Sequence, residues 1–283
     1  MAVKLFVLGL PGSGKSSVAR YISTHARDRR WSITHITDYD ILYQMFQEDT
    51  QGQFEPADFG GFDIIDLSAF DVALKSLEQQ VNENISTAKS TEIILIEFSR
   101  NDYQRAFQQF SHPSFLKDGY FLYLDANIGT CKRRIRERIT HPTTSDDHFV
   151  SEYIFGAYYH GDNGRCLSNI LEKDYMLDKQ RVLVIDNNCS LEATSKKIAP
   201  FIDYIINSSS ILKDKVDMSS SSLEGPVTNE VVNTSVNNPG QSISDDTSVS
   251  PKVHSKYFKF GTCPNLKYFE CTCLIFSKVG PPK

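Results

Sequence analysis

Hydrophobic residues fall in short, nearly continuous runs over the first 206 positions, and longer stretches with helical spacing separate these runs. The five runs are predicted strands at residues 4–9, 32–37, 92–98, 120–125 and 181–186. Runs such as Ile93-Ile94-Leu95-Ile96 are typical of parallel strands that are buried on both faces. The predicted helices cover residues 15–27, 41–47, 67–88, 102–110, 128–138, 149–159 and 191–207. This alternation predicts a three-layer α/β domain at residues 1–206.

The pattern stops after residue 206. Residues 207–255 are rich in Ser, Asn, Thr, Asp and Val, contain no aromatic residue and have no helical or strand period. Such a segment buries too little apolar area to offset an ordering entropy on the order of 1–2 kcal/mol per residue, so we expect disorder. Residues 256–283 carry aromatic residues and three cysteines. These cysteines lack the paired spacing of a zinc site, and we interpret the segment as a tail without its own fold, a docking or metal-binding tail being the alternative.

Composition narrows the possible partners. The formal net charge of −5 gives no bulk attraction to nucleic acid or to an anionic membrane, so neither is an expected partner. No run approaches the roughly 18 apolar residues that span a bilayer, and the widely separated Cys131, Cys166 and Cys189 suit reduced thiols. We therefore expect a cytoplasmic protein; the oligomeric state stays open.

The clearest chemical pattern is Gly-x₄-Gly-Lys-Ser at residues 9–16, after a predicted strand and before a predicted helix. Glycines let backbone N–H groups surround phosphates, Lys15 can reach the β- and γ-phosphates, and Ser16 can ligate Mg²⁺. The helix N-terminus adds positive charge. The residues predicted to bind the nucleotide are Gly9, Leu10, Pro11, Gly12, Ser13, Gly14, Lys15, Ser16, Ser17 and Arg134.

Kinases, GTPases and mechanical ATPases share this loop, and other motifs distinguish them. The guanine-binding pattern Asn-Lys-x-Asp does not occur in the chain. The third predicted strand ends in the single acid Glu97, followed by Phe98-Ser99-Arg100, where a mechanical ATPase usually has Asp-Glu. We expect Glu97 to orient Mg²⁺ or its water, an ordinary strand-end role being the alternative. These observations favour an ATP-dependent kinase; the alternative is a regulatory ATPase without an acceptor.

Two carboxylates, Asp38 and Asp40, follow the second predicted strand. The carboxyl ends of parallel strands face the ligand crevice, so either group could accept the proton of an acceptor hydroxyl. Capping of the next helix is the competing role. We therefore predict catalytic roles for Asp38 and Asp40, with Asp40 also touching the substrate.

Arg134 and Arg138 stand four positions apart on a predicted helix and project from one face. On a lid covering about residues 130–160, they could neutralise charge on the transferring phosphoryl group. A solvated basic face or a nucleic-acid patch is the alternative. The predicted acceptor-binding residues are Asp40, Arg100, Phe59 and Phe62, and the two phenylalanines could equally cover the core.

On these motifs, residues 1–206 resemble the nucleoside and nucleotide kinase-like branch of P-loop phosphotransferases, which includes adenylate kinase, shikimate kinase and dephospho-coenzyme A kinase. Asp38-Tyr39-Asp40 is similar to the Asp-x-Asp of shikimate kinase, and Arg134 with Arg138 resembles the Arg-x₃-Arg of the adenylate kinase lid. The resemblance implies a five-stranded parallel sheet in the order 2-3-1-4-5, a helical lid and ATP as donor. We expect the long loop at residues 49–63 to bind the acceptor, since long loops in compact domains are commonly functional. Residues 51–63 match no substrate loop of these families, so the resemblance leaves the acceptor open among a nucleoside, a nucleotide and another alcohol.

Overall fold

The computed structural model describes residues 2–140, 148–160 and 162–220, with side chains as far as residue 209. Five parallel strands form the main sheet, in the order β2-β5-β1-β6-β7. The strands are β1 (Val3–Gly9), β2 (Ser32–Thr37), β5 (Glu92–Phe98), β6 (Tyr120–Asp125) and β7 (Val182–Asp186). Counted along the chain, these strands have the order 2-3-1-4-5, so the predicted α/β fold and strand order are confirmed.

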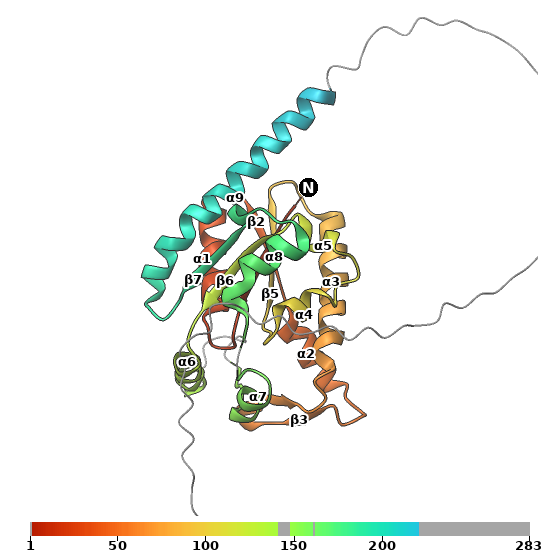
Figure 1. The fold of residues 1–283 in the computed structure, drawn as a ribbon, viewed down its shortest axis with the longest axis vertical. Coiled ribbons are helices and arrows are strands. Elements are labelled where there is room, and N and C mark those ends of the chain that lie inside the picture. Colours follow the sequence, from red (N-terminus) through yellow and green to blue (C-terminus); the bar gives the residue numbers. More distant parts are fainter. Residues whose placement is uncertain (1, 141–147, 161, 221–283) are drawn as a thin grey trace, which may run out of the picture. The chain divides into compact units, whose positions relative to one another are not determined.

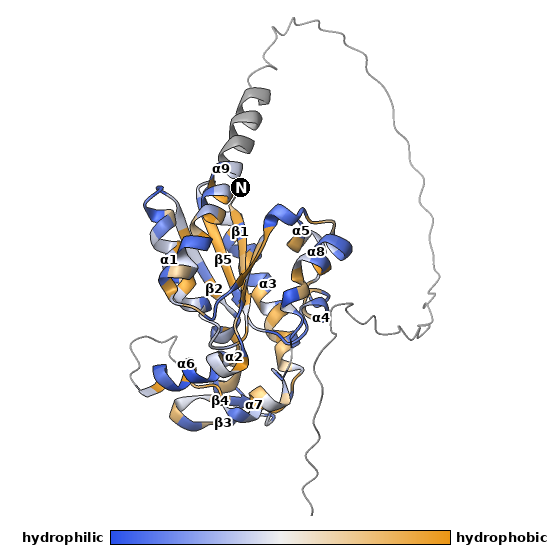
Figure 2. Ribbon diagram, turned by 60° about the vertical axis from the view of Figure 1, so that its left-hand side comes forward, coloured by the Kyte–Doolittle hydropathy of each residue, from blue (hydrophilic) through white to orange (hydrophobic). Residues whose placement is uncertain are grey.

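Alternate residues of each strand enter two hydrophobic clusters. In β1, Leu5 and Val7 face one cluster while Phe6 and Leu8 face the other, because successive side chains of a strand point to opposite faces. Helices α1 (Lys15–Arg27) and α9 (Leu191–Ser220) cover the first face. The second face is covered by α3 (Ala69–Thr87), α4 (Tyr103–Phe107), α5 (Ser114–Lys117) and α8 (Leu167–Tyr175). The strands are the most hydrophobic elements between these two layers (Figure 2).

The segment predicted as a long acceptor-binding loop contains a small hairpin. Strands β3 (Phe54–Pro56) and β4 (Phe62–Ile64) pair antiparallel, with the short helix η1 (Asp58–Gly60) between them. The carboxylate of Asp49 accepts hydrogen bonds from the N–H groups of Gln51 (2.8 Å) and Phe54 (2.9 Å) and thereby fixes the turn before β3. Three-residue strands are too short to show a period of two, which is why the sequence pattern did not predict them.

Several helices differ from their predicted bounds. The predicted helix at 149–159 is shorter, α7 (Glu152–Ala157), because the Ser151 hydroxyl accepts from the Ile154 N–H (3.1 Å) and caps it there. Helix α8 was not predicted. Helix α9 continues to Ser220, past the predicted end at 207, since adding turns to an existing helix costs far less than nucleating one. Residues 221–255 and the tail at 256–283 lie outside the described residues.

The elements that border the site lie at the carboxyl ends of the strands. Helix α2 (Asp38–Gln47) follows β2 directly, and the Thr37 hydroxyl caps it by accepting from the Tyr39 N–H (3.1 Å). Helix α6 (Ile128–Thr140), α7 and the β3–β4 hairpin lie together below the sheet in Figure 1. No helix within the described part of the chain is long and apolar enough to cross a membrane.

Candidate active site

The loop between β1 and α1 has the backbone that its glycines allow. Gly9, Gly12 and Gly14 have φ values of +147°, +77° and +99°, which side chains with a Cβ rarely adopt. A Cβ on Gly12 would lie 2.5 Å from the backbone oxygen of Cys131 in α6. Glycine at this position therefore allows both the turn of the loop and the close approach of α6.

Gly12→Ala is expected to weaken the binding of a nucleoside triphosphate about 100-fold, because the methyl group has to displace α6 or the loop that is predicted to bind the phosphates. Gly52→Ala is the matched control, since Gly52 has a similar φ of +72° and no atom lies within 4 Å of the position that its methyl group would take. Both variants carry the cost of a left-handed alanine, about 1–2 kcal/mol. Nucleotide titration and thermal unfolding of the two variants separate the effect of the clash from that of the backbone strain. Equal affinity in both variants would contradict the prediction.

Lys15 lies inside the loop. Its ammonium Nζ donates to the backbone oxygens of Gly9 (3.2 Å) and Leu10 (3.1 Å) and to Ser99 Oγ (2.7 Å). Burial lowers the pKa of Lys15, an effect that the nearby Glu97 partly offsets. The ammonium is therefore held at the cavity wall by three neutral oxygens and lies 4.0 Å from Glu97 Oε1. Anionic phosphate oxygens can replace the neutral oxygens with stronger bonds, because both partners are then charged.

Ser16, Glu97 and His35 form a second cluster beside Lys15. Ser16 Oγ donates to Glu97 Oε1 (3.3 Å), and His35 Nε2 lies 3.1 Å from Glu97 Oε2. Burial opposes the charge of Glu97, but the hydrogen bond from His35 and the Lys15 ammonium outweigh burial and lower its pKa. Hydroxyl and carboxylate oxygens are the donors that Mg²⁺ takes from proteins, together with water and substrate phosphates, so these two side chains fit that ion. Within the described residues there is no cluster of three or more metal-ligating side chains.

Asp38 and Arg100 form a buried ion pair behind the cavity. The Arg100 guanidinium contacts the Asp38 carboxylate and donates to the backbone oxygens of Ser99 (2.6 Å) and Phe70 (2.7 Å). It also lies over the rings of Phe70 (4.8 Å) and Phe98 (5.6 Å). Burial disfavours this guanidinium charge, but the Asp38 carboxylate outweighs burial and raises the pKa of Arg100. Asp38 therefore reaches the cavity already paired.

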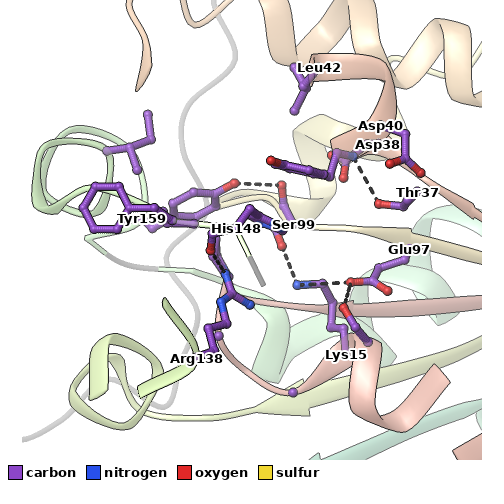
Figure 3. A pocket seen from close by; sticks show the side chains of 18 of the residues that line it. Lys15, Thr37, Asp38, Asp40, Leu42, Glu97, Ser99, Arg138, His148 and Tyr159 are labelled. Carbon is purple, nitrogen blue, oxygen red and sulfur yellow. Dashed lines mark hydrogen bonds and ion pairs between the residues drawn. The ribbon is translucent and has the colours of Figure 1, made fainter. Parts of the chain in front are cut away.

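A cavity of about 390 Å³ connects these groups (Figure 3), which falls in the range of small-ligand sites. We call the part contributed by the loop, α1 and α6 the phosphate wall: Pro11, Gly12, Gly14, Lys15, Ser16, Ser17, Arg20, Arg134 and Arg138. We call the part contributed by other elements the second wall: Thr37, Asp38, Tyr39, Asp40, Leu42, Phe62, Ile64, Phe70, Ser99, Phe149, Val150, Ile154 and Tyr159. His35, Glu97 and His148 complete the lining.

The segment around α6 and α7 covers the cavity. Arg134 donates to the backbone oxygens of Ser13 (3.2 Å) and Asn187 (2.9 Å), which docks α6 on the phosphate loop. Arg138 donates to the backbone oxygen of His148 (2.6 Å), and the ring of His148 stacks on Tyr39 at 3.5 Å. The Ser151 hydroxyl donates to the Asp63 carboxylate of the hairpin. These contacts join both sides of the cavity across its opening.

Most of the site residues that the sequence predicted line this cavity, and a few lie outside its lining. Gly9, Leu10 and Ser13 belong to the loop but are not part of the wall. Arg100 is 1% exposed behind Asp38, and Phe59 is 72% exposed at the hairpin tip, where its ring lies 5.5 Å from Phe149. The sequence reasoning missed Thr37, Tyr39, Ser99, His148 and Tyr159. Three of them had a signal in the sequence through their position: Thr37 and Tyr39 flank Asp38, and Ser99 stands two residues after Glu97.

The chain matches one protein-family model and is similar to several solved structures. A family model described as AAA domain matches residues 5–154. No curated protein matches the chain. Solved structures with similarity include an unliganded sugar kinase from Janibacter sp. HTCC2649 (16% identity, 72% of this chain and 95% of that chain, TM-score 0.42). Another is Kti12 of Chaetomium thermophilum in complex with ADP-AlF3 (12% identity, 72% and 97%, TM-score 0.45). A third is the APS kinase CysC of Mycobacterium tuberculosis in complex with AMPPNP and APS (14% identity, 71% and 98%, TM-score 0.42). At these TM-scores the likeness says nothing about substrate or reaction.

Proposed function

This chain belongs to the AAA-domain family, and we propose that it is an ATP-dependent phosphotransferase (kinase) that transfers the γ-phosphoryl group to a hydroxyl of a small molecule. The observation that carries the proposal is the cavity of about 390 Å³ in which the phosphate loop faces a second wall with an exposed carboxylate, Asp40. A triphosphate on the loop would leave its γ-phosphate directed at that wall. An ATPase that only hydrolyses its nucleotide does not need an enclosed second wall opposite the phosphate loop.

The phosphate wall supplies the positive charge. Lys15 and the N-terminus of α1 bind the β- and γ-phosphates, and Arg138, which reaches the His148 backbone oxygen inside the cavity, stabilises the transferring group. Arg134 is engaged with three backbone oxygens, those of Ser13, Asn187 and Cys189, so we assign it the docking of α6 on the loop as its main role. Ser16 and Glu97 would hold Mg²⁺, which neutralises phosphate charge when bound.

The second wall supplies the acceptor side. We assign proton acceptance to Asp40, because its carboxylate is exposed and belongs to the lining of the cavity, whereas the Asp38 carboxylate is buried against Arg100. Arg100 in turn positions Asp38 and Ser99. The acceptor oxygen bonds to the γ-phosphorus while the bond from that phosphorus to the β–γ bridging oxygen breaks. ADP keeps the electron pair of the broken bond, and the hydroxyl proton passes to the Asp40 carboxylate.

Closure over the cavity limits hydrolysis. The stack of Tyr39 on His148 and the hydrogen bond between Ser151 and Asp63 hold the covering segment against α2 and the hairpin. Water excluded in this way cannot compete with the acceptor for the phosphoryl group. Phe62 belongs to the hairpin side of the same cover and touches Tyr39 at a ring distance of 5.8 Å.

Asp40→Asn is expected to lower phosphoryl transfer about 100-fold or more, because asparagine keeps the shape but cannot accept the proton. ATP affinity should stay within about twofold, since Asp40 lies on the wall opposite the phosphate loop. Asp71→Asn is the matched control, another first-turn carboxylate of a helix, which lies outside the described lining of the cavity. The rate of product formation measures phosphoryl transfer, and nucleotide titration measures ATP affinity. Unchanged transfer in Asp40→Asn would remove this residue from the mechanism.

The reaction itself is tested by incubating the chain with ATP, Mg²⁺ and separate pools of nucleosides, nucleotides and small alcohols. Mass spectrometry then detects any compound that has gained a phosphoryl group. We expect a product in at least one pool, with ADP formed in equal amount. Steady ATP hydrolysis without any phosphorylated compound would instead support the regulatory ATPase.

A further inference from the structure

The two carboxylate oxygens of Glu97 contact different neighbours. Its Oε1 accepts a hydrogen bond from the Ser16 hydroxyl (3.3 Å) and lies 4.0 Å from the Lys15 ammonium (Figure 3). Its Oε2 lies 3.1 Å from Nε2 of His35. The oxygen that faces the phosphate loop is therefore distinct from the oxygen that His35 contacts.

The main sheet brings His35 to this carboxylate. Strand β2 lies at the edge of the sheet and pairs with β5, with His35 opposite Leu95 and Thr37 opposite Glu97. Side chains two positions apart on a strand point to the same face, so the His35 and Glu97 side chains lie on one face of the sheet. Both side chains line the cavity, and that of His35 is 32% exposed while that of Glu97 is 10% exposed. The imidazole thus reaches the carboxylate from the adjacent strand.

The imidazole is the donor of this hydrogen bond. Burial opposes the charge of Glu97, but the bond from His35 and the Lys15 ammonium outweigh burial and lower the pKa of Glu97, so its carboxylate is ionised at neutral pH. An ionised carboxylate can only accept, so Nε2 of His35 carries a hydrogen, as it does in the protonated ring and in one of the two neutral tautomers. The terminal torsion of a glutamate has no sharp preference of its own. A donor on Oε2 therefore determines where Oε1 points.

We propose that His35 is a positioning residue, which holds Glu97 with Oε1 turned toward Ser16 and the Mg²⁺ site. This inference rests on the Mg²⁺ site of the proposed function and deepens it. A side chain that is already fixed loses little conformational freedom when it binds an ion, and the hydrogen-bond partners that orient metal ligands contribute to metal affinity for this reason. A histidine that only satisfied a buried carboxylate would stabilise the fold without a specific effect on the ion.

The experiment measures the binding of Mn²⁺, a spectroscopic substitute for Mg²⁺, to the full chain with a non-hydrolysable ATP analogue, the chain being in excess. Electron paramagnetic resonance of the free ion gives its Kd. His35→Met, which has a side chain of similar length without an N–H group, is expected to raise the Kd of Mn²⁺ about 10- to 100-fold. His35→Gln should stay within about threefold of the natural chain, because its amide nitrogen can place an N–H group close to the position of Nε2. His35→Phe keeps a ring without an N–H group and should behave as His35→Met does, so it carries the test if methionine disturbs the fold.

Two further variants are controls. Glu97→Gln should raise the Kd of Mn²⁺ at least as much as His35→Met does, since it removes the charge of the ligand itself. His25→Met is the matched control, because His25 Nε2 also lies close to a carboxylate, 3.0 Å from Asp203 Oδ1, but outside the described lining of the cavity, and Mn²⁺ affinity should not change. Without divalent ions, the Kd of the analogue should change less than about threefold in His35→Met, because Lys15 and the glycine loop are intact. Circular dichroism establishes that each variant folds.

Three adverse results are distinguishable. Unchanged Mn²⁺ affinity in His35→Met and His35→Phe, together with a loss in Glu97→Gln, would overturn the role of His35 alone. An equal loss of analogue affinity with and without Mn²⁺ would mean that His35 supports the whole site, which contradicts a specific role toward the ion. Unchanged Mn²⁺ affinity in Glu97→Gln would remove Glu97 from the Mg²⁺ site and overturn the inference with it, whereas the phosphoryl transfer of the proposed function is decided separately by its products.

Discussion

Lys15→Met is expected to lower phosphoryl transfer at least about 100- to 1,000-fold and to remove most of the stabilisation that ATP gives to the fold. Methionine retains the length of the side chain but has no ammonium to bind phosphate. With ATP at 100 times its Kd, the natural chain should gain about 2.7 kcal/mol; a 100-fold weaker Kd reduces this gain to about 0.4 kcal/mol. Thermal unfolding with and without ATP measures the difference.

In the ligand-free chain two effects of this variant oppose each other. Burial already disfavours the Lys15 ammonium, as its lowered pKa indicates, so removing the charge also removes a desolvation cost. Glu97, whose Oε1 lies 4.0 Å from Lys15 Nζ, in contrast loses a nearby positive charge. The ATP response is therefore measured against the same variant without ATP. Lys4→Met is the matched control: Lys4 lies on β1, its pKa is also lowered by burial, and its Nζ donates to the Phe115 backbone oxygen (2.5 Å) away from the phosphate loop. If Lys4→Met loses the ATP response as well, or Lys15→Met keeps it, Lys15 does not bind the triphosphate.

Arg100→Met is expected to lower the free energy of unfolding by about 3–5 kcal/mol, because the buried Asp38 carboxylate is left without its partner. The total free energy of unfolding of a typical domain is only about 5–15 kcal/mol, so this loss is a large share of it. Urea unfolding measures the change. Arg105→Met is the control, since Arg105 pairs with Asp71 at 3.2 Å but is 69% exposed. The free energy of unfolding of this variant should equal that of the natural chain within experimental error.

The double variant Asp38→Leu with Arg100→Met should recover at least about 2 kcal/mol relative to Arg100→Met alone, because it removes the uncompensated charge. A failure to recover would mean that Arg100 stabilises the fold through its contacts with Phe70 and Ser99 rather than through the ion pair. A separate variant, Asp38→Asn, tests whether Asp38 takes part in the chemistry. Asp38 acts as the proton acceptor only if Asp38→Asn lowers transfer far more than Asp40→Asn does.

The strands and the phosphate loop were predictable because their signals are local. Three of the five main strands have the predicted bounds, Ser32–Thr37, Glu92–Phe98 and Tyr120–Asp125, since polar residues lie at or directly after the end of each. The loop at residues 9–16 combines its glycines, Lys15 and Ser16 within eight positions, so no distant residue is needed to identify it.

The pairing of Asp38 with Arg100 was not predictable, and the reason is the register of the sheet. Strand β2 lies beside β5, with Thr37 opposite Glu97, so the residues that follow both strand ends come together although they are 62 positions apart. The sequence alone suggested Asp38 as a catalytic group and Arg100 as an acceptor-binding group. In the folded chain each is the partner of the other, and we therefore propose Asp40 for the chemistry.

The sequence by itself determined the α/β class, the strand positions and the phosphate loop with Lys15 and Ser16, because these depend on periodicity and on residues that are neighbours in the chain. Only the tertiary structure decided the composition of the second wall. Its residues come from the end of β2, α2, the hairpin, α3, the residue after β5 and the segment around α7, and no local pattern links them. Burial and pairing then determine which charges face the cavity. The side chains of Asp40 and Arg138 reach the lining, whereas the guanidinium of Arg100 is neutralised behind it.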